Sequence, residues 1–458
     1  MKQEKFHPLF NTTQLIVGGF AAVIFVATLI LMLPISSATG EWTNVISALF
    51  TATTAVCVTG LVVVPTYLHW SLFGKIIILV LIQLGGLGII CITMGLFIIF
   101  KRKITIKERR LIQESYNLDT GAGMVKTIIK VFKTTFIIEG IGAFLYTFKF
   151  IPEFGVVKGL WFSVFHAISA FCNAGLDLLG ENSLGPYATD WYMNLVTMFL
   201  IISGGIGFLV WWEILDILKR IKDGKLASNK FFERLSLHAK IALFATGVMI
   251  VSGAVIVFVL EYNNPETIGN LNLSEKIIVS MFESVTLRTA GFATVSQAGF
   301  TNSSIIMMCG FMLVGGSPMG TAGGIKTTTV AILLIDVWSA IKGKKHAEVF
   351  QRKITDQNRR NAISVTAIAI FVASVALIIL SYTENIQFKK LLFESFSAIG
   401  TVGLSMDITS SLSNIGRLII TFLMFAGRIG PITLVMAFTS KSTNAVERDY
   451  PERNIMIG

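Results

Sequence analysis

Four short segments of this chain end alike, each with a glycine followed by Leu or Phe. The closing glycines, Gly60, Gly175, Gly291 and Gly403, recur at intervals of 115, 116 and 112 residues. Such a regular long period indicates one unit repeated along the chain. Glycine permits backbone conformations that turn carbonyl oxygens inward, and rings of carbonyl oxygens can replace the water shell of a cation. The four segments therefore predict a cation-binding ring with one loop from each repeat.

The residues beside the glycines suit this chemistry. Thr401-Val402-Gly403 is close to the Thr-Val-Gly sequence of potassium-channel filters. No segment brings a carboxylate to the last turn before its glycine, which disfavours a divalent-cation site. Only one glycine is common to all four segments, so the filter should be less constrained than that of a tetrameric channel. The predicted filter residues are Val58, Thr59, Gly60, Asn173, Ala174, Gly175, Thr289, Ala290, Gly291, Thr401, Val402 and Gly403.

A four-residue motif that begins with glycine, here called the second mark, follows each filter glycine by 24 to 29 residues. In its first two copies, 85–88 and 204–207, we interpret it as a device for close helix packing. The third copy opens the segment 315–326, where Pro318 and several glycines should break a spanning helix. Irregular backbone at membrane depth lines a cavity, so this segment is predicted to be a movable plug under the filter. The order Gly-Gly-Ile-Lys, with no preceding strand, argues against a phosphate-binding loop.

Two charges at membrane depth, Lys326 and Arg428, are expected to be functional. Arg428 replaces the second glycine of the fourth mark and should point at the axis, where a positive charge raises the barrier to cations. The alternative is a charge neutralised by a carboxylate, with the candidates Glu139, Glu213 and Asp336. The predicted gate comprises Gly315, Gly316, Ser317, Pro318, Gly320, Thr321, Gly323, Gly324, Lys326 and Arg428.

The third filter segment differs from the others. It is one residue shorter between Phe282 and Gly291 than the matching intervals elsewhere, and it places Arg288 near the filter. We expect Arg288 to support the loop by pairing with Glu283 or with a carbonyl group.

The elements that position these residues are membrane helices. The chain is 53% hydrophobic and 14% charged, against about 25% charged in soluble domains. The filter segments are too short to span a bilayer and favour re-entrant helices. We therefore predict an all-α integral membrane protein, with eight transmembrane helices in four repeats of helix, re-entrant pore helix, filter loop and helix around a pseudo-fourfold pore. The apolar stretches are 15–34, 72–100, 127–149, 192–218, 238–261, 304–335, 362–381 and 415–440.

The charges set the orientation. The net charge is +11, and most Lys and Arg residues lie in 101–126, 219–240, 342–360 and the termini, whereas the alternate loops are acidic or neutral. This is the positive-inside pattern, which predicts cytoplasmic termini and excludes a nucleic-acid partner. The basic loops either are solvated beside the lipid or dock a cytoplasmic partner. The predicted segments are 1–14, 15–100 (first repeat), 101–126, 127–218 (second), 219–237, 238–342 (third), 343–360, 361–440 (fourth) and 441–458.

Taken together, these motifs resemble those of the Trk/Ktr/HKT superfamily of potassium transporters, and most closely the membrane subunit of bacterial Ktr systems. The matching motifs end in Gly60, Gly175, Gly291 and Gly403, or contain Lys326 and Arg428. The resemblance implies potassium uptake in a bacterial cell membrane, with K⁺ on the carbonyls of the four glycines and sodium dependence in many members. It also implies a homodimer, a separate cytoplasmic ring of nucleotide-binding regulatory subunits and no organic cofactor. The chain departs from the family pattern at Pro318 and Met319, where small residues are usual.

Two other functions, an enzyme and a coupled symporter, fit these residues less well. A membrane-embedded enzyme would need clustered catalytic residues, but the five histidines are scattered along the chain, so we predict that the protein is not an enzyme. A coupled cation symporter with alternating access is the closer rival. Inverted repeats with broken helices would favour it, whereas four units of one orientation favour a gated pore.

Overall fold

The computed structural model describes residues 12–88, 91–92, 94–95, 124–180 and 182–438. These residues are helical except for loops and one antiparallel pair of short strands, β1 (Glu348–Val349) and β2 (Arg352–Lys353). The predicted segment 441–458, with most of 1–14 and of 101–126, lies outside the described residues.

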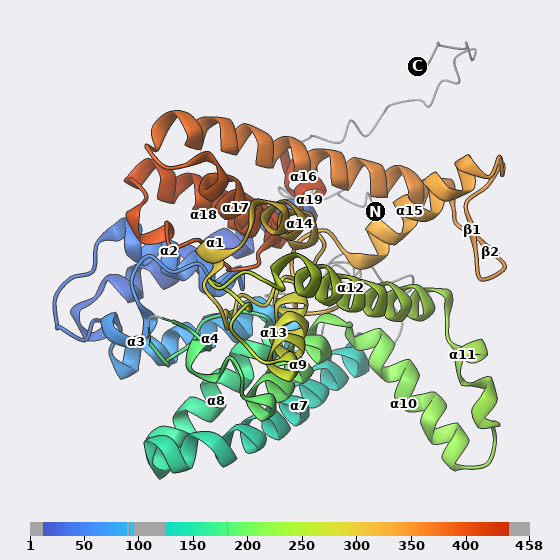
Figure 1. Cartoon of the computed structure of the whole chain (residues 1–458), viewed down its shortest axis with the longest axis horizontal. Coiled ribbons are helices and arrows are strands. Elements are labelled where there is room, and N and C mark those ends of the chain that lie inside the picture. Colours follow the sequence, from blue (N-terminus) through green and yellow to red (C-terminus); the bar gives the residue numbers. More distant parts are fainter. Residues whose placement is uncertain (1–11, 89–90, 93, 96–123, 181, 439–458) are drawn as a thin grey trace, which may run out of the picture.

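Each predicted repeat contains a long first helix, a short helix and a second long segment (Figure 1). The first helices are α1 (Thr12–Met32), α7 (Met124–Phe154), α12 (Leu237–Glu261) and α16 (Asp356–Thr383). The short helices are α2 (Val45–Val56), α8 (Val156–Cys172), α13 (Leu273–Thr286) and α17 (Phe388–Gly400). The second segments begin with α4 (Leu72–Leu87), α9 (Trp191–Gly205), α14 (Asn302–Met312) and α18 (Asn414–Ile429). Smaller helices are α3 (Thr66–His69) and α11 (Phe231–Arg234).

Local sequence determines where many of these helices begin. A polar N-cap side chain accepts a backbone N–H from the first turn, which satisfies one of the free donors at the helix start. In α13 the arrangement is a full capping box between Asn272 and Glu275. The other side-chain N-caps are Asn44, Ser71, Asp190, Ser236, Thr301, Thr355 and Ser413.

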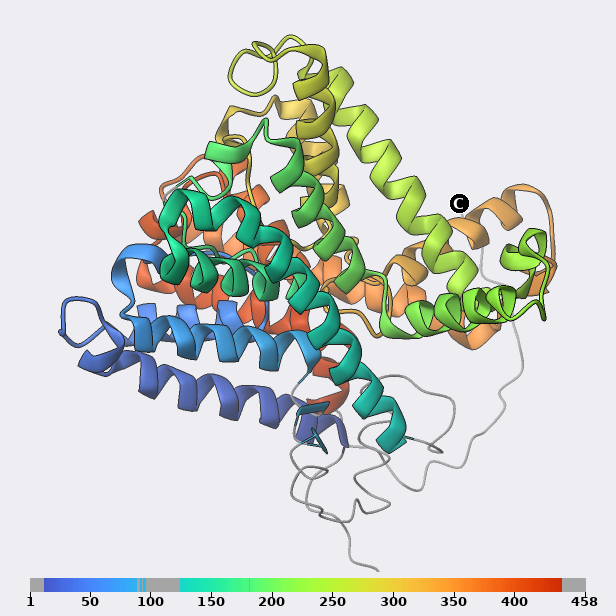
Figure 2. The same cartoon turned by 90° about the horizontal axis from the view of Figure 1, so that it is seen from below.

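The short helices connect the repeats in a closed ring. Besides contacting helices of its own repeat, each short helix packs against the second segment of a neighbouring repeat. Helix α2 contacts α18, α8 contacts α4, α13 contacts α9, and α17 contacts α14. The blue helices α1 and α4 of the first repeat also lie side by side (Figure 2). The ring of contacts brings the ends of all four short helices together.

Not every apolar stretch forms a straight span. Within the described residues, α1, α12 and α16 are long and apolar enough to cross a membrane, as are two pairs of helices if each pair is one span. The stretch 192–218 bends by 100° between α9 and α10 (Phe208–Lys222), and 415–440 bends by 96° between α18 and α19 (Pro431–Phe438). The stretch 304–335 in the third repeat is interrupted between α14 and α15 (Thr327–Ile341). The sequence had indicated a helix break in the third repeat only. The structure has breaks in the second and fourth repeats as well.

Glycine makes the two bends possible. Gly207 precedes α10 with φ of 95°, and Gly430 ends α18 with φ of 93°. A left-handed backbone of this kind is accessible to glycine at little cost. The interpretation of the second mark as a packing device holds for its first glycine, because a Cβ at Gly85 or Gly204 would lie about 2 Å from a carbonyl oxygen at the end of a short helix. A packing role does not explain the last glycine of the mark, which allows the bend.

Candidate functional site

The four filter glycines meet in a closed ring. Each has a positive φ, between 64° and 99°. A Cβ placed on Gly60 would lie 2.7 Å from the Ala174 carbonyl oxygen, and one placed on Gly175 would lie 2.7 Å from that of Ala290. In the same way Gly291 faces the carbonyl of Val402, and Gly403 faces that of Thr59, at 2.5 and 2.1 Å. Each glycine thus receives the carbonyl group of the next loop, and a side chain has no room.

The short helices end in the same conformation beside this ring. The residue two positions before each glycine has a left-handed backbone, with φ of 53°, 59°, 68° and 52° at Val58, Asn173, Thr289 and Thr401. This turn stops the helix and lets the chain return in extended form. The partially negative C-terminal ends of α2, α8, α13 and α17 are therefore directed at the region of the ring, where they favour a cation.

The shorter third segment has a local explanation. In the other three repeats the amide before the glycine donates five residues back, as from Thr59 to Thr54 and from Val402 to Ser397. In the third, Ala290 donates only four residues back, to Thr286, at 3.0 Å. The missing residue is absorbed in the last helical turn, and Gly291 keeps its place in the ring.

A hydroxyl group at one shared position fastens each loop. The N–H of Gly60 donates to Thr54 Oγ1 at 2.9 Å, and the N–H of Gly403 donates to Ser397 Oγ at 3.1 Å. In the other two repeats the hydroxyl donates instead, from Ser169 to the Leu176 carbonyl and from Thr286 to the Phe292 carbonyl, both at 2.6 Å. These hydroxyl groups are not among the predicted site residues, although a Ser or Thr recurs five or six residues before every predicted filter glycine.

The interrupted segment between α14 and α15 is an ordered loop. Gly315 donates its N–H to the Ile325 carbonyl at 2.8 Å, and Ile325 donates to Leu313 at 3.1 Å. The two ends of the loop are therefore held side by side. A Cβ on Gly315 would lie 3.1 Å from Thr289 Cγ2. The predicted gate segment thus lies against a filter loop.

The loop is also docked on the second repeat. Its amides at Ser317 and Thr321 donate to the carbonyls of Gly205 and Gly204 at 2.7 and 3.0 Å. The Thr321 hydroxyl donates to the Phe171 carbonyl at 2.8 Å. The carbonyl groups freed where α9 ends before its bend therefore serve as acceptors for the loop.

The remaining gate glycines have close neighbours. A Cβ on Gly316 would lie 2.6 Å from the Gly205 carbonyl oxygen, and one on Gly320 would lie 2.9 Å from it. Gly323 approaches the Thr401 hydroxyl, and Gly324, with φ of 60°, approaches the Gly400 carbonyl. The loop therefore fits between repeats mainly because it carries few side chains.

The two residues that depart from the family pattern also have places in the loop. A Cβ on Gly207 would lie 2.4 Å from the Pro318 carbonyl oxygen. Met319 is buried, with φ of 58°, and its carbonyl accepts the N–H of Phe208 at 3.1 Å. Both residues thus meet the bend of the second repeat.

Arg428 links three repeats at this loop. Its Nη1 donates to the Thr321 carbonyl oxygen at 2.5 Å. Its Nη2 donates to the carbonyls of Gly85 and Gly86, the second at 3.2 Å. The guanidinium group thus joins the end of α18 to the loop of the third repeat and to the last turn of α4.

The carboxylates considered as alternative partners of Arg428 have other contacts. Glu139 accepts from Gln83 at 3.1 Å, Glu213 accepts from Ser236, and Asp336 forms an ion pair with Arg359 at 2.7 Å. The second cation predicted at membrane depth, Lys326, forms a hydrogen bond within its own loop. It donates to the Ala322 carbonyl at 2.7 Å and so steadies its own loop.

Arg288 is buried but does not form the expected pair with Glu283. Its Nη2 donates to Thr246 Oγ1 on α12 at 3.4 Å, whereas Glu283 accepts from Gln297. The residue therefore supports the third filter helix from the side of α12.

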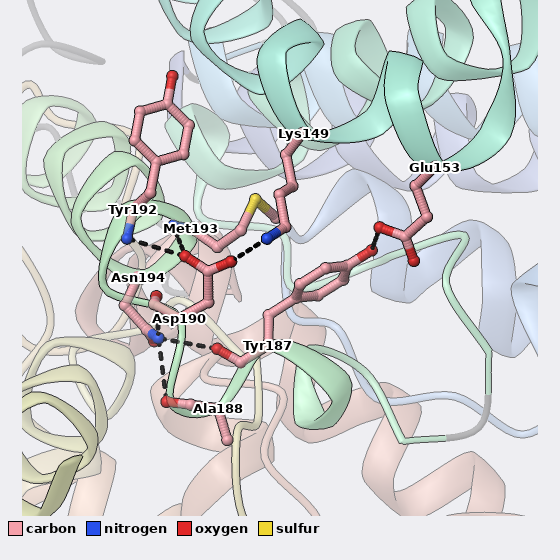
Figure 3. Close-up of polar contacts among 8 residues, drawn as sticks. All are labelled: Lys149, Glu153, Tyr187, Ala188, Asp190, Tyr192, Met193 and Asn194. Carbon is pink, nitrogen blue, oxygen red and sulfur yellow. Dashed lines mark hydrogen bonds and ion pairs between the residues drawn. The ribbon is translucent and has the colours of Figure 1, made fainter.

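A polar network fixes the loop of the second repeat between the short helix α8 and α9 (Figure 3). Lys149 on α7 forms an ion pair with Asp190, and the Tyr187 hydroxyl donates to Glu153 at 2.5 Å. The Asn194 amide donates to the Tyr187 carbonyl at 2.9 Å. The loop between the filter and α9 is thereby attached to the end of α7.

Comparison with known proteins gives a consistent family. The model of the TrkH family, described as cation transport protein, matches residues 6–448. The potassium/sodium uptake protein NtpJ of Enterococcus hirae is 40% identical over 453 residues, which cover 98% of this chain and 97% of that protein. Ktr system potassium uptake protein B of Bacillus subtilis is 38% identical over 449 residues, with the same coverage of each chain.

The fold also has a solved counterpart. The crystal structure of the potassium transporter TrkH from Vibrio parahaemolyticus matches with a TM-score of 0.74. The match covers 95% of this chain and 86% of that one, at 14% sequence identity. The likeness therefore concerns the arrangement of the helices.

Proposed function

This chain belongs to the TrkH family of cation transport proteins, and from that premise we propose that it takes up potassium through a gated pore. It is a transporter, not an enzyme, as its family and its relatives are. The observation that carries the proposal is the ring of Gly60, Gly175, Gly291 and Gly403, each packed against a carbonyl group of the next loop.

The donor set fits a large monovalent cation. Backbone carbonyls bind K⁺ in place of water, and their number and field determine selectivity over Na⁺. The short helices add the negative ends of their dipoles to this field. In our proposal the pore is lined by four repeats, and each repeat supplies two membrane-crossing segments and one re-entrant helix, eight crossings in all.

The gate is the loop 315–326 together with Arg428. The loop lies against the filter residues Thr289 and Thr401, and Arg428 donates to its Thr321 carbonyl. A cation leaving the filter toward the cytoplasm would meet this loop and a fixed positive charge, which opposes its passage. Opening then requires the loop to move and the hydrogen bond between Arg428 and Thr321 to break.

Partners and setting follow from the relatives. Three of them are named as Ktr system potassium uptake proteins, and one is named as a potassium/sodium uptake protein. We propose a homodimer in the bacterial cell membrane with cytoplasmic termini, regulated by a cytoplasmic nucleotide-binding ring. Sodium as an activator and the absence of an organic cofactor belong to the same proposal. Docking of the ring would use the basic segments 219–237 and 343–360, since their charge favours the cytoplasmic side.

Potassium flux into liposomes containing the purified protein tests the function. A gated pore passes K⁺ down its gradient in either direction, and the rate does not depend on a fixed stoichiometry with Na⁺ or H⁺. The bends at Gly207 and Gly430 keep the coupled symporter in view, because broken helices are a feature of coupled carriers. Strict coupling, with K⁺ accumulating against its gradient when only Na⁺ or H⁺ flows inward, would support the symporter and contradict the pore.

A further inference from the structure

A buried polar residue stands behind the filter at one shared position. It precedes the filter glycine by nine residues in three repeats and by eight in the shorter third one. Its side chain lies on the short helix and faces the chain that returns from the filter in at least three repeats. The four residues are Thr51, His166, Glu283 and Glu394, all buried.

Two of these residues form hydrogen bonds to the returning chain. Glu394 accepts the hydroxyl groups of Ser405, at 2.7 Å, and Thr409. His166 bonds the Phe162 carbonyl through Nδ1, so its Nε2 is free to accept the N–H of Leu178 at 3.4 Å.

Glu283 has the same place in the third repeat but lacks enough donors. Its Oε2 accepts from Gln297 Nε2 at 3.4 Å. Glu283 Oε1 and Gln297 Oε1 are both buried, and neither has a donor among the described residues. Two acceptor oxygens on groups that already share one hydrogen bond are thus left unsatisfied, which is costly in a buried site.

The charged groups around Glu283 do not relieve this deficit. Arg288 turns to Thr246, and Lys276, on the same helix, donates to the Tyr262 carbonyl at 2.7 Å. Glu261, at the end of α12, acts on Glu283 with its negative charge and so repels a second one. No cation among the described residues neutralises the Glu283 carboxylate.

We propose that Glu283 is a positioning residue of the filter that works in its protonated form. A neutral carboxyl group has one O–H donor. With the proton on Oε1, it donates to Gln297 Oε1 while Oε2 accepts from Gln297 Nε2, so that both unsatisfied oxygens are paired. The resulting two-hydrogen-bond contact connects α13 to the chain beyond Gly291 and keeps that glycine in the ring. The effect on ion selection rests on the proposed function, but the protonation state does not.

Infrared difference spectroscopy tests the protonation state directly. The protein is reconstituted in lipid nanodiscs at neutral pH, and spectra of wild type and E283Q are subtracted. We expect the wild type to show a protonated-carboxyl band that E283Q lacks. The matched control is E213Q, which removes a carboxylate that accepts from the backbone N–H and the hydroxyl group of Ser236, and it should leave the band intact. A difference spectrum showing only an ionised carboxylate band lost in E283Q would overturn the proposal.

Ion selectivity gives the second readout. Glutamine preserves a neutral donor and acceptor, so E283Q should keep the K⁺/Na⁺ permeability ratio within about twofold of wild type, whereas E283A should lower it about tenfold, the scale of one buried hydrogen-bond pair. If E283A does not fold, E283Q alone decides. A ratio in E283Q reduced about tenfold, with the fold intact, would show that the charge is needed and would contradict a neutral Glu283.

Discussion

The Nη1 atom of Arg428 lies 2.5 Å from the carbonyl oxygen of Thr321. These residues belong to the fourth and third repeats and are 107 positions apart. Arg428 replaces the second glycine of the fourth mark. Its contact joins that position to the loop that interrupts the second segment of the third repeat. In the proposed gate this contact acts as a latch, because the side chain would have to release a backbone group before the loop could move away from the proposed filter.

We predict that R428A raises potassium flux about tenfold in liposomes without a regulatory partner. A hydrogen bond to a charged group stabilises a state by about 1.5–3 kcal/mol, and about 1.4 kcal/mol corresponds to tenfold in a population. The loss of a fixed positive charge near the ion path acts in the same direction. The measurement is potassium-driven flux at fixed protein density.

The comparison variant is R428K. It keeps the charge but cannot bond Thr321 and Gly86 with a planar fork, so we expect an intermediate flux. A decrease in flux in R428A, in protein that elutes as a folded species, would mean that Arg428 supports the structure and does not close the pore.

Gly403→Ser should lower potassium selectivity. Gly403 has φ of 96°, and a Cβ there would lie 2.1 Å from the Thr59 carbonyl oxygen, so the serine must displace the ring. We expect the K⁺/Na⁺ permeability ratio to fall by about tenfold, as for loss of one ligand group worth about 1.4 kcal/mol. Gly247→Ser on α12 is the control, since nothing lies within 4 Å of its Cβ position. Unchanged permeability ratios in Gly403→Ser would remove Gly403 from the filter.

The bend before α10 should depend on Gly207. Its φ is 95°, and a Cβ would lie 2.4 Å from the Pro318 carbonyl oxygen. Gly207→Ala should therefore destabilise the protein by about 1–3 kcal/mol, the cost of a side chain in a strained backbone region. Thermal unfolding in detergent measures it, with Gly140→Ala on α7 as the control because its Cβ position is open. Equal melting temperatures for the two variants would show that the bend does not need glycine.

The polar network of Figure 3 predicts a pH-dependent stability. Partial burial raises the pKa of Asp190. The hydrogen bond and charge of Lys149, together with the backbone N–H groups of Met193 and Tyr192, outweigh burial, so the pKa lies below its usual range. A carboxyl with a lowered pKa stabilises the fold above its unfolded pKa of about 4, and the contribution is lost as the pH falls through the folded value.

Asp190→Asn isolates that charge, because asparagine also caps a helix. We expect it to cost about 1 kcal/mol or less at pH 7, given the partial exposure of both side chains. The difference from wild type should vanish at low pH, below the pKa of Asp190. A melting-temperature difference that stays constant with pH would show that the ion pair contributes nothing.

Sequence predicted the parts of this molecule that repeat. The short helices and the meeting of Gly60, Gly175, Gly291 and Gly403 follow from a motif that recurs with an almost constant period, and hydropathy located the helices around them. Even the shortened third segment was visible before Gly291. These features could be predicted because a local backbone conformation restricts which residue types can occupy a position. The left-handed residue at the end of each short helix was not predicted.

The features that sequence missed depend on contacts between repeats. The bend at Gly207 was missed because a glycine in an apolar stretch also suits close helix packing, and no role was assigned to Gly430. The partner of Arg428 could not be named either. The sequence offers carboxylates such as Glu139, whereas the acceptors in the described part of the chain include backbone carbonyls, which every residue possesses and which only the fold brings within reach.

The most direct test of the filter is the reversal potential across a bilayer containing the purified protein, with potassium and sodium gradients varied independently. If the carbonyl ring around the four glycines selects K⁺, the reversal potential follows the potassium gradient and changes little when the sodium gradient alone is altered. A reversal potential that ignores the potassium gradient would contradict the account.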